Sequence, residues 1–320
     1  TKRLVVLGGG ESGVGAAILG KVKGMDVFLS DMGTIAPKYR DMLDAEGIEW
    51  EQGHHTEERI LMADEVVKSP GIPPTAPIMQ LIAAKNIPVI SEIELAGRYT
   101  DAKMVCITGS NGKTTTTMLT YHILTKAGLD VGLAGNVGNS LALQVAREPH
   151  DIYVIELSSF QLDNMYDFKA NIAVLMNITP DHLDRYDHEM QNYVNAKFRI
   201  LNNLTPEDAF IFWNDDPVIT EQLRHVTTEA ARYPFAETEE PDVAAYVDGQ
   251  GDVEFHTPGT SMTMPRADLA LNGLHNLYNS MAAGLSACLL NIKKDVISKA
   301  LGDFEGVEHR LEPVAVIDGV

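Results

Sequence analysis

The stretch VCITGSNGKTTTT, residues 105–117, constrains this chain more than any other feature, because it takes an apolar strand through a glycine turn into a helix. Gly109 and Gly112 let the backbone turn with its N–H groups pointing inward, and the positive end of the following helix faces the same spot. Lys113 adds a mobile cation, while Ile107 stands where GxxxxGK[ST] has its first glycine. The stretch predicts a loop that binds the phosphates of ATP. The competing interpretation is a plain turn before a threonine-capped helix.

Length and composition favour a soluble protein with two domains. The 320 residues are 45% hydrophobic, enough for two cores, and no segment resembles a membrane span. The chain begins with a strand and a glycine turn rather than a signal peptide, so we expect a cytoplasmic protein. A formal charge of −20 argues against nucleic acid and membranes as partners. Cys106 and Cys288 lie in apolar patterns and are expected to be buried, without a disulfide.

A second glycine pattern, GxGxxG at Gly8, Gly10 and Gly13, follows a short apolar strand and opens a helix of small residues. Asp31 follows the next strand, expected over residues 26–30, at the spacing where dinucleotide folds place a ribose-binding acid. The pattern predicts a Rossmann-like fold. It does not separate NAD from a UDP-type ligand or from a plain turn. Glu11 within the loop counts against close pyrophosphate contact unless its side chain points away.

Strands and helices alternate along the rest of the chain. The segment SPGIPP, with Ser69 and Gly71, follows a strand at the sheet edge where open α/β proteins bind ligands, although a proline-rich turn explains it equally well. The alternation predicts an α/β protein with a Rossmann-like N-terminal domain over residues 1–94. A P-loop-type central ATPase domain with a mostly parallel sheet is expected over residues 95–306. VAAYVDGQGDVEF is expected to form a hairpin with DGQG at its turn.

Polar residues follow several strands of the predicted central domain. Glu156 ends an apolar strand just before Ser158, so it is either a magnesium ligand or a helix-capping residue. Asn136 lies in a GNVG loop that fits a ligand contact or a turn. His182 follows the next strand and is expected at the same sheet edge as Glu156. Because a lysine amine with its ordinary pKa is cationic, Lys197 is a phosphate partner, a surface residue or a lysine converted to a carbamate.

Six ordered motifs resemble those of the Mur ligases, the ATP-dependent amide-forming enzymes of peptidoglycan precursor synthesis in the bacterial cell wall. They are TGSNGKTTT, ELSSFQL, NITPDHLDRY, NAKFRI, GLHNLYNSMAA and HRLE, and together they cover essentially the whole chain. LSSFQL and DRY favour the branch that adds D-glutamate to UDP-N-acetylmuramoyl-L-alanine through an acyl phosphate. The resemblance implies a UDP-sugar site, rather than an NAD site, at the N-terminal glycines. An NAD-dependent dehydrogenase and a nucleotide-binding fragment without turnover are the alternative hypotheses.

The resemblance also implies roles for individual residues. ATP is expected to contact Gly109, Ser110, Asn111, Gly112, Lys113, Thr114, Thr115, Asn276, Asn279, His309 and Arg310. The UDP-sugar is expected to contact Gly10, Ser12, Asp31, Ser69, Gly71, Asn136 and Ser158. Two magnesium ions are expected, one held by Thr114 and Glu156 and one by His182 and a carbamylated Lys197. Lys113, Glu156, His182 and Lys197 are the predicted catalytic residues.

Mur ligases continue into a third domain that supplies most of the amino-acid pocket. Residues 307–320 are interpreted as the start of such a domain, most of which this chain is expected to lack. We therefore expect the 320-residue chain by itself to bind nucleotides without forming the amide bond. It is also expected to be a monomer. The expected partners are UDP-N-acetylmuramoyl-L-alanine, D-glutamate and ATP.

Overall fold

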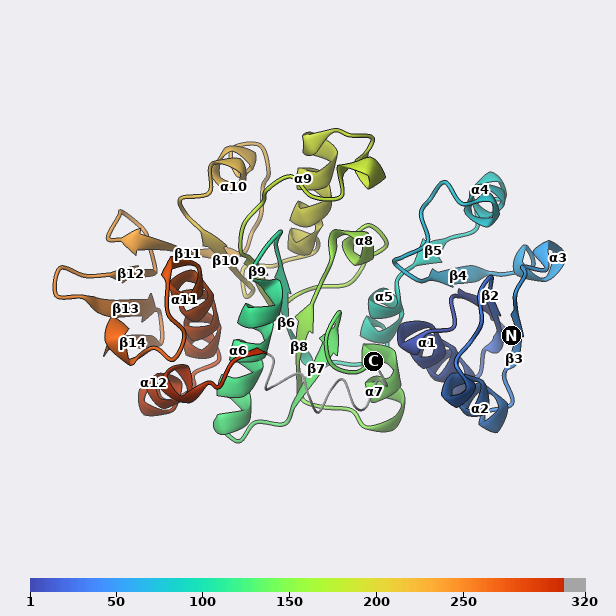
Figure 1. The fold of residues 1–320 in the computed structure, drawn as a ribbon, viewed down its shortest axis with the longest axis horizontal. Helices are drawn as coiled ribbons and strands as arrows, with labels where there is room; N and C mark the ends of the chain where they lie inside the picture. The colour runs from blue at the N-terminus through green and yellow to red at the C-terminus, as the bar shows by residue number, and fades with distance from the viewer. Residues whose placement is uncertain (308–320) are drawn as a thin grey trace. The chain divides into compact units, whose positions relative to one another are not determined.

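The computed structural model describes residues 1–307, which form two compact units, each built on its own sheet (Figure 1). The first unit contains Thr1–Asp101 together with two later segments, Asn139–His150 and Phe160–Phe168, whereas the sequence prediction ended this domain at residue 94. The predicted start of a third domain at residues 307–320 lies almost wholly outside the described residues. Within residues 1–307, no helix is both long and apolar enough to cross a membrane.

The first unit has a five-stranded, fully parallel sheet in the order β3-β2-β1-β4-β5, which confirms the predicted Rossmann-like arrangement. The strands are β1 (Arg3–Leu7), β2 (Asp26–Asp31), β3 (Glu49–Gln52), β4 (Glu65–Lys68) and β5 (Val89–Ile90). The helices are α1 (Glu11–Val22), α2 (Pro37–Ala45), α3 (Glu57–Ile60), α4 (Pro77–Ala84), α5 (Glu92–Gly97) and α7 (Leu141–Arg147), and α8 (Ser159–Leu162) leads into the last segment. Strand order reverses beside β1, so the chain turns away on both sides of it and leaves a crevice at the sheet edge.

Helix α1 packs closely because it carries glycines. A Cβ at Gly13 would lie 1.9 Å from the carbonyl oxygen of Gly8, so the last glycine of GxGxxG has no room for a side chain. A Cβ at Gly15 would lie 2.0 Å from Oγ of Ser140, at the start of α7. These glycines therefore bring α1 against both its own loop and α7.

Two glutamates of α5 bind the two later segments of the first unit. The buried Glu92 carboxylate accepts hydrogen bonds from Oγ of Ser140 at 3.1 Å and from N–H of Ala142 at 2.7 Å, at the N-terminus of α7. The Glu94 carboxylate accepts three 3.0 Å bonds from the backbone N–H groups of residues 166–168. Burial raises the pKa of Glu92 to about 7, although the helix N–H groups and Ser140 favour its ionised form.

The second unit has a nine-stranded sheet in the order β14-β13-β12-β11-β10-β9-β6-β8-β7. Pairing is parallel from β7 to β12, as the mostly parallel prediction requires, and antiparallel through β12, β13 and β14. The predicted hairpin is confirmed, with DGQG between β12 and β13. The strands are β6 (Lys103–Thr108), β7 (Val131–Gly135), β8 (Ile152–Glu156), β9 (Ile172–Leu175), β10 (Ala209–Trp213), β11 (Ala231–Thr238), β12 (Ala245–Val247), β13 (Asp252–Thr257) and β14 (Thr260–Pro265).

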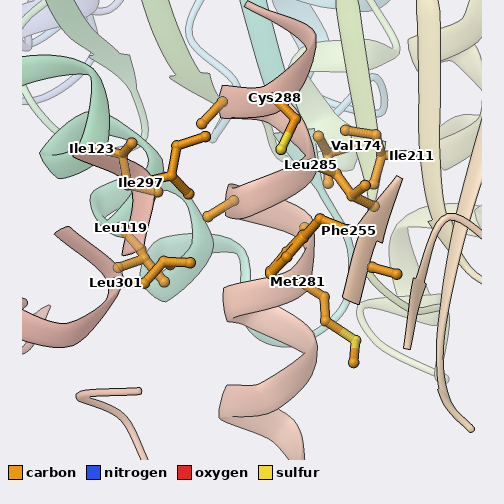
Figure 2. Packing of buried hydrophobic residues seen from close by; sticks show 14 of the residues in the cluster. Leu119, Ile123, Val174, Ile211, Phe255, Met281, Leu285, Cys288, Ile297 and Leu301 are labelled. Carbon is orange, nitrogen blue, oxygen red and sulfur yellow. The ribbon is translucent and has the colours of Figure 1, made fainter. Parts of the chain in front are cut away.

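Helices α6, α11 and α12 bury their apolar side chains against this sheet (Figure 2). The remaining helices of the unit are α9 (Met190–Phe198) and α10 (Pro217–Gln222), with short 3-10 turns at Leu183–Tyr186, Arg199–Leu201 and Arg266–Asp268. The core helices are α6 (Lys113–Lys126), α11 (Leu274–Leu289) and α12 (Lys294–Asp303). Cys106 and Cys288 are both buried and free, as predicted. The core thus holds α6, which follows the phosphate loop, against α11.

We expect the first unit to lose stability as pH rises from about 4.5 to 7, because Glu92 is ionised in the unfolded chain over this range but stays protonated when folded. The shift corresponds to about 3 kcal/mol of unfolding free energy, which is fully lost above the folded pKa. Because the glutamine of Glu92→Gln cannot ionise, the free energy of unfolding of this variant should change less between pH 4.5 and 7 than that of wild type. Urea unfolding at pH 5 and pH 8 measures this free energy. Trp50 fluorescence in a Trp213→Phe background reports on the first unit, because Trp50 is then the one tryptophan left.

The matched control is Glu58→Gln, which changes an exposed glutamate of α3 and should keep the wild-type pH dependence. Equal pH slopes for wild type and Glu92→Gln would contradict the assignment.

Candidate functional site

The predicted phosphate loop connects β6 to α6 in the second unit. Gly112 is left-handed, with φ +83°, and immediately precedes the first residue of α6, Lys113. The first turn of a helix leaves its N–H groups without intrahelical partners, so they point at the space beside the loop. Lys113 stands at that helix end. The turn therefore has the geometry of an anion-binding site.

Asn177, which follows β9, holds the loop in shape. Its Oδ1 accepts hydrogen bonds from the N–H groups of Ser110 at 3.1 Å and Asn111 at 2.8 Å, and its Nδ2 donates to the carbonyl oxygen of Asn111 at 2.8 Å. Oγ of Ser110 also donates to the carbonyl oxygen of Thr179 at 2.9 Å. The N–H groups of Ser110 and Asn111 thus contact Asn177, and the N–H groups of the first helical turn remain for a phosphate.

Thr114 and Glu156 bring two oxygen donors together beside the loop. Oγ1 of Thr114 lies 2.9 Å from Oε2 of Glu156, because β8 pairs with β6 and ends at the same edge. Glu156 is almost fully buried, and burial raises its pKa above the ordinary value. The Thr114 hydrogen bond and the charges of Lys113 and Lys197 oppose this rise. Hard oxygen donors of this kind suit magnesium.

Lys197 extends from α9 to the strand that leads into the loop. Its side chain is buried, and its Nζ donates to Oγ1 of Thr108 at 3.1 Å and to the carbonyl oxygen of Gly109 at 3.0 Å. Tyr193, one turn earlier on α9, lies with its hydroxyl 2.8 Å from Oγ of Ser110. One face of α9 therefore supports the loop at both Gly109 and Ser110.

His182 lies at the surface in a left-handed conformation, with its side chain 58% exposed. Its Nε2 is 3.5 Å from Oδ1 of Asp181. Within residues 1–307 no group of three or more His, Cys, Asp or Glu side chains is arranged to hold a metal ion. The oxygen donors that the structure brings together beside the loop are those of Thr114 and Glu156.

A cavity of about 440 Å³ lies beside the loop. Asn279 of α11 forms part of its wall, where Oδ1 accepts a 3.0 Å hydrogen bond from Oγ1 of Thr116 and leaves no room for a Cβ at Gly112. Nδ2 of Asn279 donates to Oδ1 of Asn276 at 3.2 Å. The cavity is lined by Asn111, Gly112, Met176, Asn177, Thr179, Trp213, His275, Tyr278 and Asn279. Its aromatic and amide side chains suit a flat, polar-edged ring.

The first unit has a larger cavity, about 590 Å³, at the carboxyl edge of its sheet. It is lined by Gly8, Gly9, Gly10, Asp31, Met32, His54, His55, Glu57, Ser69, Ile72, Ala76, Pro77 and Ile78. The glycine loop and the N-terminus of α1 form one wall, where a diphosphate would meet backbone N–H groups. Glu11 does not point into this loop, since its Oε1 accepts a 3.0 Å bond from N–H of Ser140.

Asp31 binds the glycine loop itself. Its two carboxylate oxygens accept 2.7 Å hydrogen bonds from the N–H groups of Gly9 and Gly33. On the other side of the cavity, Nζ of Lys68 donates to the carbonyl oxygen of Ile72 at 2.8 Å. The loops after β1, β2 and β4 are thus each fixed by a charged side chain.

Comparison with known families decides what this pair of sites belongs to. Residues 2–91 match the model of the Mur ligase MurD-like N-terminal domain, and residues 107–287 match that of the Mur ligase middle domain. The chain belongs to the Mur ligase family. The GxGxxG pattern, which by itself also fits NAD, is therefore part of a Mur ligase N-terminal domain.

Relatives of this Mur ligase align over the whole chain. A protein of Bacteroides thetaiotaomicron is 64% identical over 100% of this chain and 71% of its own length. A protein of Porphyromonas gingivalis is 56% identical over 99% of this chain and 71% of its own length. Both are named UDP-N-acetylmuramoylalanine--D-glutamate ligase.

Solved structures share the fold at lower identity. A UDP-N-acetylmuramate:L-alanyl-gamma-D-glutamyl-meso-diaminopimelate ligase of Neisseria meningitides aligns with a TM-score of 0.66 and 20% identity, over 95% of this chain and 98% of that one. A MurF ligase of Thermotoga maritima, solved in complex with ADP, aligns with a TM-score of 0.51 and 16% identity, over 88% of this chain and 64% of that one.

The residues predicted for this Mur ligase fall into separate groups. Lys113, Thr114 and Glu156 lie together at the loop, with Asn279 on its other side. Gly10, Asp31 and Ser69 line the first unit's cavity, while Asn136 and Ser158 belong to the second unit. His309 and Arg310 lie outside the described residues. The ligands assigned to all of these residues stay predictions.

The sequence interpretation missed Asn177, Lys68 and His55. Asn177 stands in the motif NITPDHLDRY, where an amide directly after a buried strand was a usable signal. Lys68 and His55 carry no such signal, because their roles depend on loops that come together only in the fold.

Asn177→Asp should weaken binding of a nonhydrolysable ATP analogue by at least about tenfold, because aspartate cannot donate to Asn111 and adds negative charge beside the phosphates. Isothermal titration calorimetry with Mg²⁺ measures the change. Asn195→Asp, which adds the same charge at an exposed position of α9, should bind like wild type. Wild-type affinity in Asn177→Asp would show that the hydrogen bonds of Asn177 to the loop do not matter for nucleotide binding.

Proposed function

We propose that this Mur ligase joins D-glutamate to UDP-N-acetylmuramoyl-L-alanine at the expense of ATP. The observation that carries the proposal is the 64% identity, over the whole chain, with a relative named for this reaction. A cavity beside a glycine loop in each unit supports the proposal, because such a reaction uses two nucleotides. The dehydrogenase alternative has no support from either family match.

The UDP-sugar would bind in the cavity of the first unit. Its diphosphate would lie against the glycine loop before α1, and its base would contact the apolar side chains of Met32 and Ile72, which line the cavity. Asp31 keeps the loop in position and remains able to accept a ribose hydroxyl, because each carboxylate oxygen has further lone pairs.

ATP would bind in the second unit. Its phosphates fit the helix end with Lys113, and its adenine fits the neighbouring cavity by Tyr278 and Asn279. The oxygens of Thr114 and Glu156 would hold magnesium, which when bound neutralises phosphate charge. Two protein oxygens are enough, because magnesium commonly completes its shell with phosphate and water.

The reaction is a problem of charge, since a carboxylate must attack a triphosphate. The alanyl carboxylate oxygen would bond to the γ-phosphorus as ADP leaves, forming an acyl phosphate. The neutral amine of D-glutamate would then attack the acyl carbon and lose one proton to solvent, and phosphate would leave from the tetrahedral intermediate to give the amide. Lys113 would counter the negative charge that develops in the first step, while the rigid loop keeps the phosphates in line.

We also propose a second magnesium site at His182 and a carbamylated Lys197. The buried Lys197 amine lies at the loop. Its ammonium would lose one proton to give the neutral amine, which would add carbon dioxide and lose a second proton to give a carbamate anion. Such an anion could bind a metal that an ammonium repels.

Three other expectations stay predictions. They are the cytoplasmic location, the monomeric state and the inactivity of the 320-residue chain alone.

In the whole protein that carries this chain, phosphate release should require ATP, UDP-N-acetylmuramoyl-L-alanine and D-glutamate together. Lys113→Ala should lower the rate by about 100-fold or more, because a positioned charge at the phosphates is lost. Lys126→Ala, at the exposed far end of the same helix, should not. If phosphate were released at the same rate without D-glutamate, or equally fast with another amino acid, the proposed reaction would be wrong.

The carbamate should be visible by carbon-13 NMR after incubation with labelled bicarbonate. Wild type should show a carbamate signal that Lys197→Arg lacks, because arginine keeps the charge and cannot form the adduct. Identical spectra would mean that Lys197 acts as an ammonium, through its bonds to Thr108 and Gly109.

A further inference from the structure

His55 lines the first unit's cavity and ends a hydrogen-bond chain that reaches into the protein. Its Nδ1 lies 2.7 Å from Oγ of Ser30, a fully buried side chain of β2. The same Oγ lies 2.8 Å from Oε1 of Glu51, at the end of β3. Glu51 also accepts bonds from the N–H and the hydroxyl of Thr56.

This chain determines which ring nitrogen of His55 carries its proton. Burial would raise the pKa of Glu51, but hydrogen bonds from Thr56 and Ser30 outweigh it and lower that pKa, so the carboxylate is ionised and only accepts. The single hydroxyl proton of Ser30 therefore goes to the Glu51 carboxylate at 2.8 Å rather than to the carbonyl oxygen of His54, a neutral acceptor 3.3 Å away. Oγ of Ser30 has short contacts to Glu51 and to Nδ1 of His55, and its own proton serves the first. The second contact is a hydrogen bond only if Nδ1 carries a proton and donates it to Oγ.

Nε2 of His55 is consequently a lone-pair acceptor. Nδ1 faces the buried Ser30, which leaves Nε2 on the cavity side, and among the described residues Nε2 has no hydrogen-bond partner. Burial lowers the pKa of His55, as does the charge of His54, while Glu51 and Asp31 raise it. Glu57 is the other charged residue in the cavity wall. A lowered pKa keeps the ring neutral near pH 7.

We propose that Nε2 of His55 accepts the N3–H of uracil and so selects uridine over cytidine nucleotides. Uracil carries a proton at N3, whereas cytosine has a lone pair there that would oppose the lone pair of Nε2. Met32 and Ile72 supply apolar walls for the flat ring. This inference rests on the proposed function, which places a UDP-sugar in this cavity.

Calorimetry with the wild-type chain provides the first test. UDP should bind about tenfold or more tightly than CDP and than UDP methylated at N3, because each competitor leaves Nε2 without its proton donor. The preference for UDP over CDP should also shrink as pH falls below the ordinary histidine pKa of 6.5, where Nε2 becomes protonated. Because UDP and CDP carry the same diphosphate, its contribution to binding cancels from the ratio of their dissociation constants.

Two variants separate the acceptor from the rest of the ring. His55→Asn can still donate to Ser30 but has no atom at the place of Nε2, so its UDP-to-CDP ratio should fall nearly to one. His55→Gln reaches that place with an acceptor and should recover part of the ratio. His225→Asn, an exposed histidine of the second unit, should keep the wild-type ratio.

The possible failures are distinguishable. Absence of UDP binding by wild type would overturn the proposed function together with this inference. UDP binding with an unchanged ratio in His55→Asn would overturn this inference alone. Should that variant not fold, equal binding of UDP and its N3-methyl form by wild type would overturn it as well.

Discussion

The position of β6 between β8 and β9 is the constraint on which the second unit's site depends. Parallel strands end at the same edge, so the predicted phosphate loop after β6 meets Glu156 from one neighbour and Asn177 from the other. The first neighbour supplies an oxygen donor beside Thr114. The second satisfies the backbone of the loop, which would otherwise leave polar groups without partners.

The ligands proposed for both units are anions, although the chain has a formal charge of −20, and in the first unit several acids bond to the backbone of the unit itself. The carboxylates of Glu11, Asp31 and Glu92 accept hydrogen bonds from backbone N–H groups of their own unit. At the proposed ATP site, Lys113 and the N-terminus of α6 supply positive charge. Local placement of charge thus outweighs the net charge over the short distances that matter for binding.

Much of the fold could be predicted from sequence, because apolar strands, the two glycine loops and the DGQG hairpin are local patterns. The composition of the first unit could not. Helix α7 joins it through bonds from Ser140 and Ala142 to Glu92, residues that lie about fifty positions apart in the chain. No local pattern records such a partner, since the pairing follows from which surfaces are buried together.

The sequence by itself determined the chemistry that is available at each strand end. Gly13 and Gly112 could be predicted from the glycine motifs, and the structure shows that neither site has room for a side chain. Lys113 and Glu156 could be predicted because each is a charged residue near the end of an apolar strand. Only the tertiary structure decided what those groups do. The proton on His55 depends on Ser30 and Glu51 from two neighbouring strands. Hydrogen bonds act over about 3 Å, so their partners are known only once the fold has brought distant segments within that distance.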